Sequence, residues 1–306
     1  MSRFRKQIPE SHGEFISLGA VGWVHKVNGR IALKSPREDN CDKFAHENKM
    51  YEIFGSHFPC PDLSHSFLRV PTGNFLALYT GGTLEERLRG HQNRSEGPGG
   101  GIIMEVKQKE SISLVERWIM ELSNAAAWLE SLGYVHNDIR PPNLLLDAHD
   151  HLKLADFDSV QEIGTPAEGS AAPWARVLGP EAGEECGSFG VNGARYEQFA
   201  IGSVLYLMTR GYEPYDDGTI DPENAPVVVD LLQRMEFPPL GEARLDTIIE
   251  KCWKGRFNSL TDLAAETKLL PGAIDLPRAT AFEEKYCSQI RKECEQLVEN
   301  GILDED

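Results

Sequence analysis

Several features that define other classes of protein are missing from this sequence of 306 residues. It has no run of about 18 apolar residues, so no segment is predicted to span a bilayer. Its first ten residues lack the apolar core of a signal peptide. Its 6 cysteines are scattered and include no Cys-x-x-Cys pair, which argues against a disulfide framework and a zinc ribbon. We therefore expect a cytoplasmic protein, and a nuclear location stays open.

Positive charge is also scarce, because 31 basic residues face 48 acidic ones and the net charge is -17. A surface of this sign repels phosphate backbones and anionic lipids, so we expect no nucleic-acid partner and no membrane partner. The apolar fraction of 41% is enough for a sizeable core. The length suggests one bilobal unit or two small domains.

The first 80 or so residues have the pattern of short strands. Asn28-Gly29 separates two of these strands and is typical of a type I′ turn, so residues 23–34 are predicted to form a hairpin. The expected strands are Gly13–Leu18, Trp23–Val27, Arg30–Lys34, Phe67–Val70 and Asn74–Tyr79, with a helix from about Asp42 to Phe54.

Helical patterns dominate the later part of the chain. Residues 89–112 are mixed in charge and contain GPGGG, so we expect a flexible insertion there. Apolar residues then recur every three or four positions from Leu114 to Leu132, which predicts an amphipathic helix. A charged helix is expected over about 281–299. Strands first and helices later indicate an α+β fold with a break near residue 80.

The residues that indicate chemistry lie between Tyr134 and Val160. Asp138 and Asn143 flank Arg140-Pro141-Pro142, which favours an extended, rigid loop. Two short apolar strands follow, and Asp156-Phe157-Asp158 ends the second strand. Their hairpin brings Asn143 and Asp156 to neighbouring strand ends, where two oxygen ligands suit Mg²⁺. With Asp138 free to accept a proton, this equipment indicates phosphoryl transfer.

HNDIRPPN followed by DFD resembles the HRDxxxxN and DFG motifs of the eukaryotic protein-kinase superfamily, and a divergent fungal group within it. Other motifs of that superfamily occur in the same order. They are Leu18–Val24 for the glycine-rich loop, Ile31–Lys34 for VAIK, Gly179-Pro180-Glu181 for APE, Glu197–Gly202 for the start of the long helix, and Cys252-Trp253.

The resemblance implies a two-lobed kinase-like fold, with a small β-rich N-lobe over residues 1–80 and a larger helical C-lobe over residues 81–306. It also implies ATP, with Mg²⁺ or Mn²⁺, and a protein substrate of unknown identity. Asp138 would be the base, Lys34 with Glu47 would position the phosphates, Arg140 would neutralise charge, and Asn143 with Asp156 would bind metal. The residues expected to contact the nucleotide are Gly19, Gly22, Val24, Ala32, Lys34, Leu78 and Tyr79.

Three departures from the family pattern bear on activity. Asn137 replaces the arginine that receives an activation-segment phosphate, so we expect little control by such phosphorylation. Asp158 replaces a glycine, and a side chain at positive φ costs about 1–2 kcal/mol. The glycine-rich loop is two residues short and lacks its middle glycine.

Three functions remain open at this point. A Ser/Thr protein kinase is favoured over a tyrosine kinase. A small-molecule phosphotransferase of the aminoglycoside or choline kinase type also has H-x-D, a following Asn and a DFD-like end. A pseudokinase scaffold fits the altered loop, although all four of Lys34, Asp138, Asn143 and Asp156 are retained.

Overall fold

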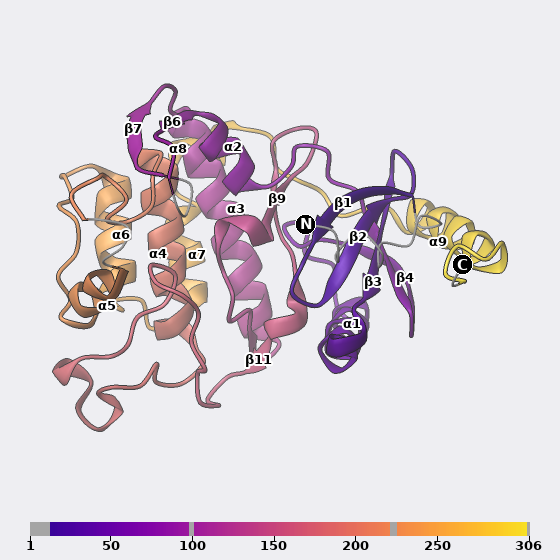
Figure 1. Cartoon of the computed structure of the whole chain (residues 1–306), viewed down its shortest axis with the longest axis horizontal. Helices are drawn as coiled ribbons and strands as arrows, with labels where there is room; N and C mark the ends of the chain where they lie inside the picture. Colours follow the sequence, from indigo (N-terminus) through magenta and orange to yellow (C-terminus); the bar gives the residue numbers. More distant parts are fainter. Residues whose placement is uncertain (1–12, 98–100, 221–224, 305–306) are drawn as a thin grey trace. The chain divides into compact units, whose positions relative to one another are not determined.

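Two units make up the chain in a computed structural model that describes residues 13–97, 101–220 and 225–304 (Figure 1). The sheet unit consists of residues 1–80, 156–159 and 280–306, and the helical unit consists of residues 81–155 and 160–279. The sheet unit thus includes the short segment Asp156–Ser159 and the C-terminal helix in addition to the first 80 residues.

The sheet unit contains an antiparallel sheet of five strands in the order β1-β2-β3-β5-β4. The α+β fold class is confirmed by this sheet and the helices that follow it. The sheet is accompanied by α1 (Cys41–Gly55) and α9 (Glu284–Glu299). The strands are β1 (Glu14–Leu18), β2 (Gly22–Lys26), β3 (Ile31–Pro36), β4 (Ser66–Val70) and β5 (Gly73–Ala77).

The β2–β3 hairpin is present, but its turn differs from the expected type I′ turn. Neither Asn28 nor Gly29 has a positive φ. The Asn28 side chain instead accepts hydrogen bonds from the backbone N–H groups of Arg30 (2.8 Å) and Ile31 (3.0 Å). Asparagine often closes turns in this way, so the pair was a correct sign of a turn and a wrong sign of its type.

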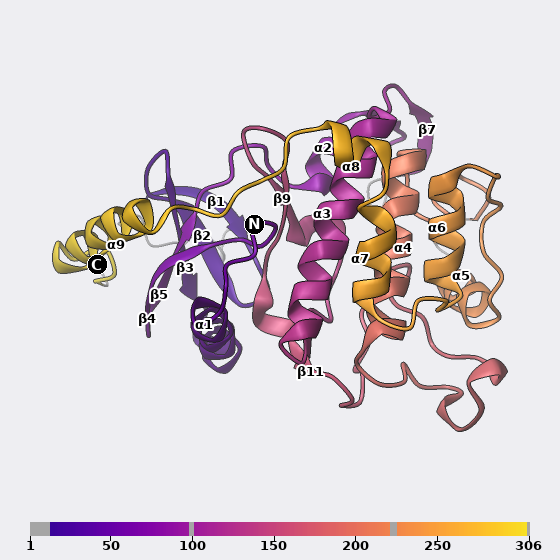
Figure 2. The same ribbon diagram turned by 180° about the vertical axis from the view of Figure 1, so that it is seen from behind.

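Helix α9 packs on the sheet through one apolar stripe (Figures 1 and 2). Cys287, Ile290 and Cys294 are buried against a cluster that includes Ile31 and Leu33 of β3. Because alternate residues of a strand point to opposite faces, Ala32 and Lys34 face away from α9. The helix is tied further by Glu293, which accepts hydrogen bonds from the side chains of Asn28 (2.8 Å) and Arg30 (2.7 Å).

The helical unit is built around α3 (Ile112–Ser131), the amphipathic helix that the apolar spacing predicts. Ser111 caps its start, and Gly133 follows its end at a φ of 86°. Packed on α3 are α4 (Ala194–Arg210), α7 (Leu260–Thr267) and α8 (Pro271–Asp275), and α6 (Arg244–Trp253) packs on α4. Helices α2 (Leu84–Gly90) and α5 (Ala225–Gln233) complete the set in the described residues.

The short strands of the helical unit form three antiparallel pairs. They are β6 (Gln92–Arg94) with β7 (Ile103–Val106), β8 (Tyr134–Val135) with β11 (Gln161–Glu162), and β9 (Leu144–Leu146) with β10 (Leu152–Leu154). The β9–β10 pair is the expected hairpin after Asn143.

The expected flexible insertion over 89–112 is more regular than its composition indicates. Its described part contains β6 and β7, and Arg94 forms an ion pair with Asp216 (2.9 Å). Residues 98–100 of GPGGG, the N-terminal residues 1–12 and the last two acidic residues lie outside the described residues. No helix in the described parts of the chain combines the length and apolarity that crossing a membrane requires.

Candidate active site

Lys34 is the centre of a buried charge cluster in the sheet unit. Its ammonium nitrogen lies 2.6 Å from a carboxylate oxygen of Glu47 on α1 and 2.6 Å from a carboxylate oxygen of Asp156. Lys34 and Glu47 are almost fully buried. We call these three residues the Lys34 cluster. The geometry brings together the lysine and the glutamate that the motif order pairs.

The charges of the Lys34 cluster depend on one another. Burial alone would lower the pKa of Lys34, but the adjacent carboxylates of Glu47 and Asp156 keep it above its ordinary value. Burial raises the pKa of Glu47 to about 7, against the opposing effect of Lys34. The ammonium group of Lys34 is therefore what favours the ionised form of this buried carboxylate.

Phe157 fixes the position of its neighbour Asp156, which comes from a part of the sequence distant from Lys34 and Glu47. Its buried ring makes edge-to-face contacts with Tyr51 (5.1 Å) and Phe54 (5.0 Å) of α1. Asp156 has a φ of 68°, which aspartate tolerates better than most residues. The aromatic contacts therefore hold Asp156 beside Lys34.

Asp158 does not have the backbone strain expected for the residue in the glycine position. The positive φ belongs to Asp156, and Asp158 lies in a 3₁₀ turn, Phe157–Ser159. Its carboxylate accepts a hydrogen bond from the Ser159 hydroxyl (2.7 Å). Burial, and then the charge of Asp156, raises the pKa of Asp158. The expected strain was wrong because the tight backbone position lies two residues earlier.

The loop after β8 holds a second cluster, in the helical unit. The Oδ2 atom of Asp138 accepts hydrogen bonds from Arg140 Nε (2.9 Å) and Asn143 Nδ2 (2.8 Å), and its Oδ1 atom accepts one from the Ser170 hydroxyl (3.0 Å). We call these four residues the Asp138 cluster. A carboxylate with a hydroxyl group at 3.0 Å has the geometry required of a general base.

Glu197, the first residue of the long-helix motif, binds the backbone of this loop. Its buried carboxylate accepts hydrogen bonds from the backbone N–H groups of His136 (3.0 Å) and Asn137 (2.8 Å). Asn137 has a φ of 65°, so the loop turns sharply at this point. Burial raises the pKa of Glu197 to about 7, although the two N–H groups act in the opposite direction.

His136 is packed rather than catalytic, as its sequence context suggests. It is fully buried, and Nε2 lies 2.9 Å from the carbonyl oxygen of Ala155. Its Nδ1 accepts a hydrogen bond from the backbone N–H of Asp138 (3.3 Å). This pattern fits a neutral imidazole with its proton on Nε2.

Asn143 belongs to the helical unit, where its backbone is bound to the end of β10, and Asp156 belongs to the sheet unit. The carbonyl oxygen of Asn143 accepts a hydrogen bond from the N–H of Ala155 (2.9 Å), the residue before Asp156. In the described residues no group of three or more histidine, cysteine or acidic side chains gathers in a way that could hold a metal by itself. A carboxylate oxygen and an amide oxygen are each the type of ligand that a hard cation takes.

The other expected nucleotide contacts lie in and after the first strands. Gly19 donates its backbone N–H to Gly22 (2.9 Å) in the turn between β1 and β2. A side chain at Gly22 would collide with the carbonyl oxygen of Ser35. Val24 pairs with Lys34 across β2 and β3. Ala32 is buried in β3, Leu78 and Tyr79 follow β5, and the Tyr79 hydroxyl accepts a hydrogen bond from the backbone of His65.

Comparison with known proteins identifies the family. The model of the family described as protein tyrosine and serine/threonine kinase matches residues 23–265. The chain belongs to the protein kinase family.

Individual relatives are distant and much longer than the matched segments. A stretch of 110 residues is 31% identical to CBL-interacting serine/threonine-protein kinase 3 of Arabidopsis thaliana, covering 34% of this chain and 24% of that protein. A stretch of 137 residues is 31% identical to Citron Rho-interacting kinase of Homo sapiens, covering 40% of this chain and 6% of that protein. The matched part thus spans a quarter or less of these curated relatives.

The sequence predictions missed the contacts of two residues of this kinase domain. Ser170 lies in the irregular segment after Asp158, where nothing in the composition indicates which hydroxyl meets Asp138. Glu197 was recognised as a motif residue, but its role as acceptor for the loop N–H groups was not. Its place at the start of the long-helix motif was the available signal.

Proposed function

We propose that this kinase domain transfers the γ-phosphoryl group of ATP to a serine or threonine hydroxyl of a protein. The observation that carries the proposal is the 3.0 Å hydrogen bond from the Ser170 hydroxyl to Asp138. It is the contact that a general base needs with the hydroxyl group of an acceptor. Family membership supports ATP and a divalent metal in general terms.

Each retained residue has a task in this proposal. Lys34, held by Glu47, positions the phosphates, and Asp138 orients the acceptor hydroxyl and takes its proton. Arg140 neutralises charge on the phosphoryl oxygens as a planar cation that is 42% exposed. Gly19, Gly22, Val24, Ala32, Leu78 and Tyr79 are proposed to contact the nucleotide.

Asn143 and Asp156 are proposed to hold Mg²⁺, with Mn²⁺ as a substitute. Their oxygen atoms fit a cation that prefers a few protein ligands and phosphate oxygens. When bound, the ion would stabilise negative charge on the transferred group. The chain's own contribution is to hold the two oxygen ligands, one through the aromatic contacts of Phe157 and the other through the Asp138 cluster.

The deciding experiment is a radiolabelled-ATP assay with Mg²⁺ or Mn²⁺ against mixed protein and small-molecule acceptors. We expect label on protein serine or threonine. Label only on small molecules would favour a small-molecule phosphotransferase. The Asp158 carboxylate near Asp156 supports that second candidate. No transfer by the wild type to any acceptor would contradict an enzymatic role and favour a scaffold.

The metal assignment has a separate test that needs no acceptor. ATP should raise the melting temperature more with Mg²⁺ than without it, because a ligand that binds the folded state stabilises it. Asp156→Asn should remove most of that metal-dependent increment, and Asp275→Asn serves as a control at an exposed carboxylate. An unchanged increment in the Asp156 variant would contradict the assignment.

A further inference from the structure

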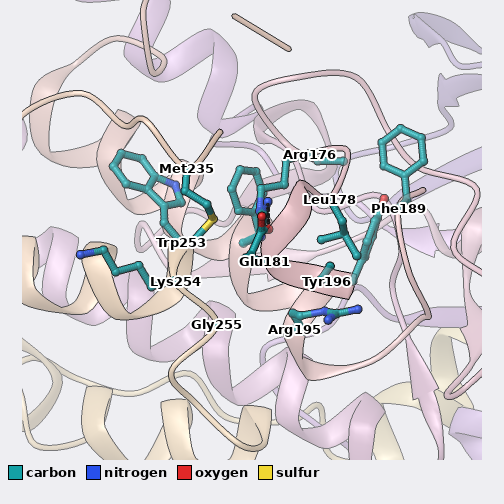
Figure 3. A pocket seen from close by; sticks show the side chains of 13 residues that line it. Arg176, Leu178, Glu181, Phe189, Arg195, Tyr196, Met235, Trp253, Lys254 and Gly255 are labelled. Carbon is teal, nitrogen blue, oxygen red and sulfur yellow. Dashed lines mark ion pairs between the residues drawn. The ribbon is translucent and has the colours of Figure 1, made fainter. Parts of the chain in front are cut away.

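The helical unit contains a pocket that none of the catalytic roles uses (Figure 3). Its volume is about 130 Å³. It is lined by the end of the segment that carries Ser170, by the start of α4, and by the ends of α5 and α6. Its apolar lining includes Leu178, Phe199, Met235 and Trp253.

The pocket has the size and lining for one apolar side chain. A protein cavity of about 150 Å³ lined by apolar side chains holds a benzene ring. Trp253 is fixed in place, because it stacks on Phe237 (4.9 Å) and donates a hydrogen bond to the Ser203 hydroxyl (3.0 Å). Phe199 and Leu178 are buried as well. Because these apolar side chains are already in place, a ligand can pack on them without first rearranging the lining.

The charged residues of the lining favour an acidic ligand. Three are basic, Arg176, Arg195 and Lys254, and one is acidic, Glu181, in a chain that has 48 acidic and 31 basic residues. The largely buried Arg176 already neutralises Glu181 at 2.8 Å. Burial alone would raise the pKa of Glu181, but the hydrogen bond from Arg176 keeps it below its ordinary value.

The remaining two cations lie on either side of the apolar lining. Figure 3 shows the side chains of Lys254 and Arg195 extending in opposite directions. Their side chains are 40% and 43% exposed, and they form ion pairs with the exposed side chains of Glu250 and Glu185 respectively. Exposed ion pairs contribute little to stability, so an acidic ligand can replace these partners.

Two residues of the pocket lining, Phe189 and Tyr196, also neighbour the Asp138 cluster. The Phe189 ring lines the pocket and also fills the space where a side chain at Gly169 would lie, directly before Ser170. Tyr196 lines it as well, and its pKa is raised by burial and then by the charges of Glu197 and Asp138. A protein that occupies the pocket is thereby held next to the segment that contacts Asp138.

We propose that this pocket docks the protein acceptor through a short acidic segment with one aromatic or large apolar anchor residue. The anchor enters between Trp253, Phe199 and Met235. The acidic residues on its two sides pair with Lys254 and Arg195. The docking role rests on the proposed function, whereas binding of the segment itself does not.

The first measurement is fluorescence anisotropy of the dye-labelled peptide Glu-Asp-Phe-Asp-Glu on the full chain. Ala182→Phe fills the pocket from a half-buried position and should weaken binding by at least about tenfold. Arg195→Ala with Lys254→Ala should weaken it by about tenfold and reduce its salt dependence. Ala243→Phe, at an exposed alanine, and Arg89→Ala, at an exposed arginine in a comparable ion pair, are the controls. Both control variants should bind the peptide as the wild type does.

The second measurement separates this proposal from the proposed function. The same peptide should raise the KM for a protein acceptor that the enzyme labels in the ATP assay, and it should leave kcat unchanged. The peptides Glu-Asp-Ser-Asp-Glu and Lys-Arg-Phe-Arg-Lys should leave this KM unchanged. Phosphorylation that the acidic peptide does not inhibit would overturn the docking proposal and leave the kinase activity standing. Peptide binding that is equal in the wild type and in both pocket variants would overturn it too. Binding without phosphoryl transfer to any acceptor would overturn the acceptor role together with the proposed function.

Discussion

The Lys34 cluster and the Asp138 cluster place carboxylates in working positions by different means. In the Lys34 cluster two carboxylates share one buried ammonium group, so ionic contacts hold both carboxylates in position. In the Asp138 cluster one carboxylate accepts three side-chain hydrogen bonds in a loop whose backbone is anchored on Glu197. Asp138 is also more exposed, at 18% of its side chain, than Glu47 at 1%.

This difference indicates how substitutions in the two clusters should affect stability and catalytic rate. Removing one partner from a buried ionic cluster leaves an uncompensated charge, which is costly for folding. Changing the charge of a hydrogen-bonded, partly exposed carboxylate leaves its partners able to reach other acceptors or water. Substitutions in the Lys34 cluster should therefore lower stability as well as activity, whereas substitutions in the Asp138 cluster should lower mainly the rate.

The largest effect is expected at Asp138. Asp138→Asn keeps the size of the side chain and one acceptor oxygen, but it cannot take a proton. We expect kcat to fall by about 10³-fold, while the free energy of unfolding changes by about 1 kcal/mol or less. Steady-state kinetics and urea unfolding measure the two effects. A loss of stability comparable to the kinetic loss would remove the distinction between the clusters.

Lys34→Met should give the largest change in stability. It leaves Glu47 and Asp156 without their shared cation, and we expect a loss of about 3 kcal/mol in the free energy of unfolding. Lys26→Met is the matched control, because Lys26 pairs with Glu14 at the surface and should cost about 1 kcal/mol or less. The double variant Lys34→Met with Glu47→Met should recover part of the loss, and a double variant that is less stable than Lys34→Met would contradict the ionic account.

Glu197→Gln tests the anchor of the Asp138 cluster through its pH dependence. Between about pH 4.5 and 7 folded Glu197 binds a proton that the unfolded chain has released, so its contribution to stability is lost as the pH rises. Glutamine does not titrate, and it leaves one buried N–H group without an acceptor, which costs about 1–3 kcal/mol.

The stability advantage of the wild type over the Glu197 variant should therefore be largest near pH 5 and shrink toward pH 7.5. Urea unfolding at several pH values measures it. Glu47 titrates in both proteins and cancels from the difference. An advantage that grows with pH would mean that the two N–H groups hold the carboxylate ionised despite its burial.

Asp158→Gly should have the smallest effect. Asp158 lies in a 3₁₀ turn without a positive φ, so glycine mainly adds conformational freedom to the unfolded chain, worth about 1 kcal/mol. We expect kcat/KM for ATP to stay within a few fold at several Mg²⁺ concentrations. A hundredfold fall that excess Mg²⁺ partly restores would show that Asp158 belongs to the metal site.

Local patterns in the sequence predicted most of the elements. The apolar spacing of residues 114–132 locates α3, and the strands and α1 lie within a few residues of their expected bounds. Such patterns succeed where the period of the helix or strand decides which side chains are buried. They did not predict the turn at Asn28, which side-chain hydrogen bonds decide, or the backbone of the DFD tripeptide, in which Asp156 and not Asp158 has the positive φ.

The site was predictable only as far as its motifs reach. The Lys34–Glu47 pair follows from two motifs in a known order. The hydroxyl of Ser170 reaches Asp138 from 32 positions away, across a segment with no repeating pattern. The docking of α9 on β3 and β4 was also missed, because the stripe of Cys287, Ile290 and Cys294 indicates a buried face and not its partner.

The packing of α9 has a consequence for biosynthesis. The face of the sheet that carries Ile31 and Leu33 gains its cover only after Cys287 has been translated, 210 residues beyond Ala77. At about 5–20 residues per second this face waits for roughly 10–40 s, long enough for the intervening helical unit to fold first. Limited proteolysis of ribosome-bound chains should find residues 81–279 protected earlier than residues 13–80. The reverse order would mean that the sheet reaches its native packing without α9.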